Sequence, residues 1–121
     1  MYILSIETTF SAAHQIKGHK GSCKRLHGHN WKVHVEICTD QLNDIGIAID
    51  FKDLHKLTRE ILQEFDHQYI NEMPAFKEIN PTAENLARYI YEKMEQKLPD
   101  PVRMIQVSLW EGEKNCVRFR K

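Results

Sequence analysis

The stretch "HGHNWKVHVEIC" (residues 27–38) alternates between two kinds of side chain along its whole length. The residues on one face begin as histidines and continue as large apolar side chains: His27, His29, Trp31, Val33, Val35 and Ile37. The other face is mostly polar. A period of two with one apolar face predicts a half-buried β-strand. Its apolar part belongs to a core, and its first residues form a candidate site at the edge of that core.

An earlier stretch, residues 2–14, has the same alternation and also ends on a histidine. Its apolar face contains Tyr2, Leu4, Ile6, Thr8, Phe10, Ala12 and His14. This pattern predicts a second half-buried strand. The polar segment "TDQLND" (residues 39–44) predicts a turn, and "IGIAI" (residues 45–49) predicts a short third strand that completes a hairpin.

After residue 50 the apolar residues recur with a period of about 3.6, which is typical of α-helices. The first predicted helix has Asp50 as its N-cap and Asp53 in its first turn. Its apolar stripe is Phe51, Leu54, Leu57, Ile61, Leu62 and Phe65. The second predicted helix has either Asn80 or Thr82 as its N-cap. Its apolar stripe is Ala83, Leu86, Ala87, Ile90 and Met94.

A final pair of strands is predicted at the C-terminus, joined by the turn "GEKN" (residues 112–115). On the first of these two strands, one face is formed by Ile105, Val107, Leu109 and Glu111. The second strand, "CVRFR" (residues 116–120), runs back beside it. The helices are consecutive rather than alternating with strands. The chain is therefore expected to form one α+β domain over residues 1–121, with an antiparallel sheet and both helices on one face.

Bulk composition excludes several classes of protein. The chain has 17 basic and 17 acidic residues, which argues against a partner that is a nucleic acid or an anionic membrane. The N-terminus has neither a basic start nor a long apolar run, so we expect no signal peptide and no membrane span. An odd count of three cysteines fits reduced thiols and a cytoplasmic location.

Three histidines are candidate metal ligands: His14, His27 and His29. Residues two apart on a strand point the same way, about 7 Å apart, so His27 and His29 can converge on one ion. If the two strands pair, His14 joins them, and three imidazoles with an open fourth position are typical of catalytic zinc. Other transition ions also accept nitrogen ligands, and solvated histidines are the alternative. The remaining histidines that we considered, His19, His34 and His55, are interpreted as structural or surface residues.

Cys23 lies in a basic segment with Lys20, Lys24 and Arg25, which favour its thiolate. A thiolate close to a metal could ligate the ion or remove a proton from a substrate. Cys38 and Cys116 fall within strand patterns and are interpreted as small, inert core residues.

Two further groups have candidate roles. Asp66 can orient His67 as a general acid or proton relay, although a histidine at a helix C-terminus is also explained by the helix dipole. Glu111 continues an apolar face, where a carboxylate needs a partner such as a ring with adjacent N–H donors. The alternative for Glu111 is that its strand simply ends in water.

Five motifs occur in an order that resembles one family throughout the chain. They are "FSAAH" (10–14), "CKRLHGH" (23–29), "FDHQYIN" (65–71), "NPTAENLA" (80–87) and "VSLWEG" (107–112). Together they resemble the 6-pyruvoyl-tetrahydropterin synthase family. The three-residue gap between Cys23 and His27 resembles its queuosine-pathway branch, 6-carboxy-5,6,7,8-tetrahydropterin synthase.

The resemblance implies a tunnelling fold, in which a four-stranded antiparallel sheet with two helices on one face joins other copies edge to edge in a barrel. It implies a homo-oligomer, either a hexamer made of two trimers or a tetramer. It also implies one Zn²⁺ per subunit on His14, His27 and His29. The implied substrate is 7,8-dihydroneopterin triphosphate, which would lose triphosphate and acetaldehyde to leave 6-carboxytetrahydropterin.

The resemblance also implies roles for other residues. Cys23 would be the general base, Asp66 and His67 a relay reached across a subunit interface, and Glu111 the anchor of the pterin ring. Thr82 and Glu84 would line that pocket. From charge alone, we expect Lys24 and Arg25, with Lys17 and Lys20, to attract the triphosphate. Gly112 stands where relatives often have threonine, so the detail of the pocket is expected to differ there.

Two other functions remain open from the sequence. One is 6-pyruvoyl-tetrahydropterin synthase activity, in which triphosphate leaves without cleavage of the side chain. The other is a protein that binds zinc or a pterin without catalysis.

Overall fold

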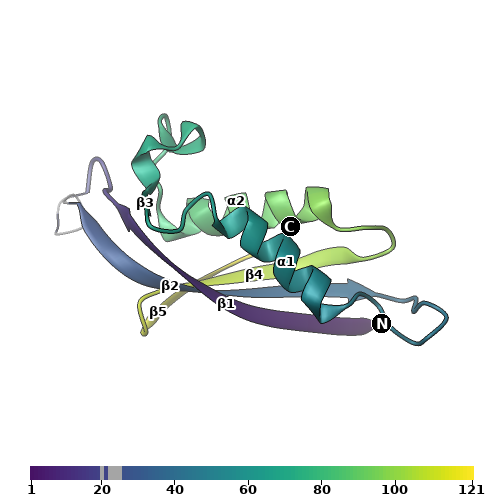
Figure 1. Ribbon diagram of the computed structural model, residues 1–121. Coiled ribbons are helices and arrows are strands. Elements are labelled where there is room, and N and C mark those ends of the chain that lie inside the picture. Colours follow the sequence, from purple (N-terminus) through teal and green to yellow (C-terminus); the bar gives the residue numbers. More distant parts are fainter. Residues whose placement is uncertain (20, 22–25) are drawn as a thin grey trace.

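A long two-stranded ribbon of β1 (Tyr2–His14) and β2 (His27–Thr39) forms the middle of the sheet in the computed structural model (Figure 1). The structure describes residues 1–19, 21 and 26–121. β1 and β2 pair antiparallel without interruption, from Tyr2 opposite Thr39 to His14 opposite His27. The remaining elements are α1 (Phe51–Leu62), β3 (Gln68–Tyr69), the 3-10 turns η2 (Ile70–Glu72) and η3 (Pro74–Phe76), α2 (Ala83–Lys97), β4 (Arg103–Glu111) and β5 (Asn115–Phe119).

Among the described residues, the sheet has five strands in the order β3-β1-β2-β4-β5, with both helices on one side (Figure 1). The α+β class and the placement of the helices are confirmed. The expected four-stranded antiparallel sheet is wrong, because β3 adds a short parallel strand beside Ala12 and Ala13. That strand forms where His67, with a φ of 58°, turns the chain after α1 and donates its backbone N–H to the Ser11 carbonyl.

The predicted strand at residues 45–49 is also wrong. This segment forms turns and bends instead. The side-chain oxygen of Asn43 accepts backbone N–H groups of both Ile45 and Ile47, each at 3.0 Å. An asparagine that bonds the backbone just after it competes with strand pairing.

The core lies between the sheet and the two helices, as the alternating and helical patterns predict. Its fully buried members include Trp31, Val33 and Val35 of β2 and Leu54, Leu86, Ile90 and Met94 of the helices. Each such side chain stabilises the fold by about 1.5–3 kcal/mol through burial. On β4 a bulge changes one expectation. Gln106 lies opposite Glu36 and Met104 lies opposite Ile37, which leaves Ile105 as the extra residue of the bulge. Met104 therefore occupies the core face in place of Ile105.

Both helix starts have side-chain caps. Asp50 accepts the Lys52 N–H, as predicted, and Thr82 accepts the Asn85 N–H at 3.2 Å. Thr82 is therefore the N-cap of α2. Asn80 bonds both backbone groups of Lys17 through its side-chain amide, which ties the segment after β1 to the start of α2.

Within the described part of the chain, no helix is both long enough and apolar enough to cross a membrane.

Candidate active site

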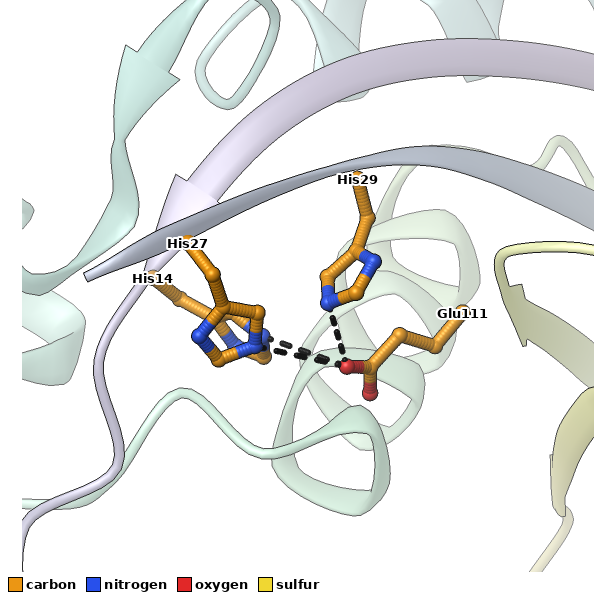
Figure 2. Close-up of side chains that lie close together, drawn as sticks. All are labelled: His14, His27, His29 and Glu111. Atoms are coloured by element: carbon orange, nitrogen blue, oxygen red, sulfur yellow. Dashed lines mark ion pairs between the residues drawn. The ribbon is translucent and has the colours of Figure 1, made fainter. Parts of the chain in front are cut away.

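Four side chains from three strands meet at one end of the ribbon (Figure 2). The strand register explains this, because His14 lies opposite His27, Ala12 opposite His29, and Trp31 opposite Glu111. All four project from the sheet face that carries the helices. Their candidate ligand atoms lie within 4.8 Å of one another. The structure thus brings the three predicted metal ligands together, and it adds Glu111 to them.

Trp31 forms the floor of this cluster. It is fully buried, and its ring lies edge-on to His14 at 5.0 Å and to His29 at 5.6 Å between ring centroids. Its Nε1 donates to the Ala12 carbonyl at 3.3 Å. Below the cluster, the sheet face therefore continues as an apolar core, which keeps water away from the inner side of the imidazoles.

His14 is held in one tautomer. Its Nδ1 lies 2.7 Å from the carbonyl oxygen of Pro81, which can only accept, so Nδ1 carries a proton. The Nε2 atom then points toward the cluster. A histidine whose other nitrogen donates to a backbone carbonyl is a common arrangement around bound metals, because it fixes the ring and raises its basicity.

The cluster fits a divalent transition ion. The Nε2 atoms of His14 and His29 are buried and have no hydrogen-bond partner in the described part of the chain, which is costly unless another group binds them. Burial lowers the pKa of the His29 imidazole, although the Glu111 carboxylate opposes this shift. A lower pKa favours the neutral ring, which is the form that binds metals. Three imidazoles and a carboxylate are a donor set that suits zinc.

Glu111 faces all three histidines through one oxygen. Its Oε1 lies 2.7 Å from the Nε2 of His29, 3.4 Å from that of His14 and 3.6 Å from that of His27. When the His14 ring is protonated, its hydrogen bond to the carboxylate is the largest cause that holds the pKa of Glu111 below its usual value, against the opposing effect of burial. The carboxylate is therefore ionised at neutral pH.

A pocket of about 460 Å³ opens beside the cluster. Its lining residues are His14, Ile16, His19, Thr82, Ala83, Glu84, Glu111, Asn115, Cys116 and Val117. Thr82 and Glu84, expected in a ligand pocket, thus lie beside the candidate metal ligands. The carboxylate of Glu84 also falls in the first turn of α2, where a negative charge is stabilised by the helix dipole.

Two lining residues were missed by the sequence analysis. His19 was interpreted as structural or surface, yet it lines this pocket. Asn115 was placed in the turn, yet it pairs with Glu111 across the β4–β5 ladder. The register of that hairpin was the available signal for Asn115, because Glu111 was already a candidate.

One cysteine differs from its prediction. Cys38 is buried, as expected, but Cys116 is exposed. β5 is an edge strand, and Cys116 lies opposite Trp110 on the sheet face that the helices do not cover. The interpretation of Cys116 as a core residue is therefore wrong.

His67, which follows Asp66 in the chain, lies at a second pocket of about 510 Å³, and among the described residues this pocket shares His29 with the cluster. Its other lining residues are Ser11, Ala12, Ala13, Gly28, Asn30, His67, Gln68 and Tyr69. Asp66 Oδ1 accepts the Ser11 N–H at 2.9 Å and lies 3.0 Å from His67 Nδ1. That backbone hydrogen bond, with the His67 contact as a smaller cause, lowers the pKa of Asp66. The carboxylate is thus fixed in place to orient the imidazole.

Several predicted residues lie outside the described part of the chain: Lys20, Cys23, Lys24 and Arg25. Their predicted roles as general base and as triphosphate contacts stay predictions. Lys17, of the same basic group, is exposed.

Residues 3–121 match the profile of a family described as "6-pyruvoyl tetrahydropterin synthase". An Archaeoglobus fulgidus protein, named as a candidate 6-carboxy-5,6,7,8-tetrahydropterin synthase, is 41% identical over 98% of this chain and 96% of its own. A Synechocystis protein named 6-carboxy-5,6,7,8-tetrahydropterin synthase is 35% identical over 79% of this chain and 77% of its own.

A relative with a different name is also similar. The dihydroneopterin monophosphate aldolase of Pyrococcus furiosus is 34% identical over 86% of this chain and 84% of its own. Among solved structures, the 6-pyruvoyl tetrahydropterin synthase of Caenorhabditis elegans has a TM-score of 0.87 and 27% identity. The match covers 100% of this chain and 97% of that one.

Proposed function

This chain belongs to the 6-pyruvoyl tetrahydropterin synthase family, and on that premise we propose that it is a zinc-dependent 6-carboxy-5,6,7,8-tetrahydropterin synthase of queuosine biosynthesis. It is an enzyme, a carbon–oxygen and carbon–carbon lyase. The substrate is 7,8-dihydroneopterin triphosphate. The products are 6-carboxytetrahydropterin, acetaldehyde and triphosphate.

One observation carries this proposal. His14, His27 and His29 converge with Glu111. His14 and Glu111 also line a pocket together with Thr82 and Glu84. A bound Zn²⁺ supplies a Lewis acid for hydroxyl groups of the substrate side chain and so makes the adjacent C–H bonds more acidic. The histidines hold the ion, and their lower faces are closed off from water by Trp31.

Proton transfer is assigned to two other residues. Cys23 removes the proton from the side-chain carbon, since the basic residues around it in the sequence favour its thiolate. His67 returns a proton elsewhere, and Asp66 holds its ring in place. Elimination then expels triphosphate. Addition of one water molecule with cleavage of the C1′–C2′ bond releases acetaldehyde and leaves the carboxylate on C6 of the ring.

Substrate recognition is assigned to the pocket and to the basic segment. Glu111 accepts the adjacent N–H groups of the pterin ring, with Thr82 and Glu84 beside it. Lys24 and Arg25 attract the triphosphate.

The protein acts as a homo-oligomer, a hexamer of two trimers or a tetramer. Two features support this. Residues 2–11 of β1 pair along only one edge among the described residues, since β3 reaches only residues 12 and 13. The same end of the molecule exposes large apolar side chains, including Ile3, Ile45 and Phe51. Unpaired strand edges beside apolar surface are usually covered. Light scattering after size-exclusion chromatography tests this, and a monomer at micromolar concentration would contradict it.

Product analysis tests the reaction. The purified, zinc-loaded protein is incubated with 7,8-dihydroneopterin triphosphate, and the products are identified by mass spectrometry with a separate assay for acetaldehyde. Carboxytetrahydropterin and acetaldehyde in equal amounts are expected. A pyruvoyl product without acetaldehyde would instead indicate 6-pyruvoyl-tetrahydropterin synthase activity.

A second candidate reaction comes from the Pyrococcus furiosus relative. If this chain is a dihydroneopterin monophosphate aldolase, it should cleave the monophosphate and leave the triphosphate intact. The same incubation, repeated with 7,8-dihydroneopterin monophosphate, distinguishes the two because each predicts turnover of one substrate only.

Replacement of Cys23 separates an enzyme from a zinc or pterin binder. We expect Cys23→Ala to keep its zinc and lose turnover by at least about 100-fold, since general acid–base catalysis contributes about 10²–10⁴-fold. The matched control is Cys38→Ala, which removes a thiol near the other end of β2, outside the pocket beside the cluster. Retained turnover in Cys23→Ala would exclude the general-base role.

A further inference from the structure

One carboxylate oxygen lies at the focus of the three imidazoles. Glu111 Oε1 lies 2.7, 3.4 and 3.6 Å from the Nε2 atoms of His29, His14 and His27, respectively (Figure 2). Figure 2 shows the carboxylate end of Glu111 turned toward the three histidines. The side chain is 25% exposed.

Hydrogen bonding alone does not account for this focus. Because Nδ1 of His14 donates to the Pro81 carbonyl, a neutral His14 presents the lone pair of Nε2 to the carboxylate. Two acceptors then face each other. One added proton on a ring nitrogen could form a hydrogen bond between that nitrogen and the carboxylate. Two nitrogens need a partner, however, because His14 Nε2 and His29 Nε2 are both buried without a hydrogen-bond partner in the described part of the chain. A cation among the four atoms would satisfy them together.

The separations also fit ligands of one ion. Zinc binds nitrogen and oxygen at about 2.0–2.2 Å with tetrahedral geometry, which places pairs of ligand atoms roughly 3.3 Å apart. The three oxygen-to-nitrogen distances lie on both sides of that value. We propose that Glu111 is the fourth ligand of the divalent ion in the substrate-free protein, so that the resting metal centre is closed by three histidines and one glutamate.

This inference uses the metal site of the proposed function but not its substrate. It does bear on how Glu111 could bind the pterin ring of that substrate. A carboxylate that ligates the ion through Oε1 keeps Oε2, and at most one further lone pair of Oε1, for the pterin N–H groups. We expect Glu111 to leave the ion when the pterin ring binds through both of its oxygens, which would open a ligand position for the substrate hydroxyls.

Metal binding without any pterin tests the ligand role. The chain is stripped with a chelator, and Zn²⁺ affinity is measured by competition with a chromophoric chelator for the wild type, Glu111→Gln and Glu111→Ala. Residues outside the ligand set change metal affinity by about 10–100-fold, so loss of a ligand should weaken binding by at least about 10-fold. Glu113→Gln is the control, because it removes the same charge two residues away at an exposed position and should not change the affinity.

Visible absorption of the Co²⁺-substituted protein separates ligation from attraction by charge. The wild type and Glu111→Gln are expected to differ in the position or intensity of the ligand-field bands in the substrate-free state. Equal affinities would overturn the proposal. A weaker affinity with unchanged bands would also overturn it, since Glu111 would then act only through its charge. Failure of the pterin reaction would leave these measurements unaffected, whereas absence of metal binding by the wild type would end both proposals.

Discussion

The histidine cluster and the corner at Asp66 and His67 contain the same chemical groups in opposite settings. In the cluster, strand register fixes the imidazoles and His14 is 1% exposed. At the corner, the His67 side chain is 80% exposed and stands on a residue with positive φ. Two hydrogen bonds join the corner to Ser11 of β1: the Ser11 N–H donates to Asp66 Oδ1, and the Ser11 carbonyl accepts the His67 N–H.

This difference suggests a division of labour. A single chain completes the part of the site that is proposed to hold a metal, because three neighbouring strands supply it. The part that is proposed to move protons lies at the surface and at another pocket, as expected if it acts in the site of a neighbouring subunit. Metal binding and turnover should therefore be separable by mutation.

The largest effect is expected from breaking the cluster. His29→Ala removes a ligand, and zinc affinity should fall by more than about 100-fold, beyond the cost of losing an outer-shell residue. Turnover should be lost with it. Elemental analysis of the purified protein measures the metal. The matched control is His34→Ala, on the same strand but on the opposite face, which should keep its zinc. Stoichiometric zinc in His29→Ala would contradict the assignment.

A smaller effect, limited to turnover, is expected at the corner. His67→Ala should retain zinc and lose about 10²–10⁴-fold in turnover, the usual contribution of a general acid or base. His55→Ala, on α1, is the control for removal of an imidazole. If His67→Ala loses zinc, the two regions are not separate.

Mixing the two inactive variants sharpens the comparison. If His67 acts in a neighbouring subunit, oligomers reassembled from His29→Ala and His67→Ala chains contain some sites with both an intact cluster and an intact His67. Part of the activity should return. Each variant subjected to the same treatment alone is the control, and no recovery in the mixture would show that each chain uses its own His67.

The sequence predicted the cluster because local periodicity determines it. Alternation places His14 at the end of one apolar face and His27 and His29 at the start of another, and antiparallel pairing brings these ends together. The helices were equally predictable from their apolar stripes and, for α1, from the cap at Asp50. The sequence left the cap of α2 open between Asn80 and Thr82, and the structure shows Thr82.

What the sequence did not predict depends on geometry between distant segments. The parallel strand β3 exists because His67 turns the chain back toward Ser11, which no local pattern indicates. The contact of Glu111 with the histidines needs the register between β2 and β4, and a bulge at residue 105 shifts that ladder. Cys116 was assigned to the core because its strand was not recognised as an edge.

The smallest effect is expected from weakening the corner without removing its imidazole. Asp66→Asn keeps an oxygen that can accept the Ser11 N–H but loses the charge. Because the pKa of Asp66 is lowered in the folded protein, its ionised form stabilises the fold at pH values above the ordinary aspartate pKa. That stabilisation disappears as the pH falls through the lowered folded-state value.

Asp66→Asn should therefore be less stable than the wild type at pH 7, by less than about 1 kcal/mol because the carboxylate is 43% exposed, and equal to it in strong acid. Urea unfolding of the metal-free protein at several pH values measures the difference in the free energy of unfolding. A chelator is present throughout, because metal binding releases protons and would add its own pH dependence. Asp44→Asn, in the exposed turn before α1, is the control and should show no such dependence. A difference that stays constant with pH would mean that the corner is held by the geometry of the amide and not by the charge.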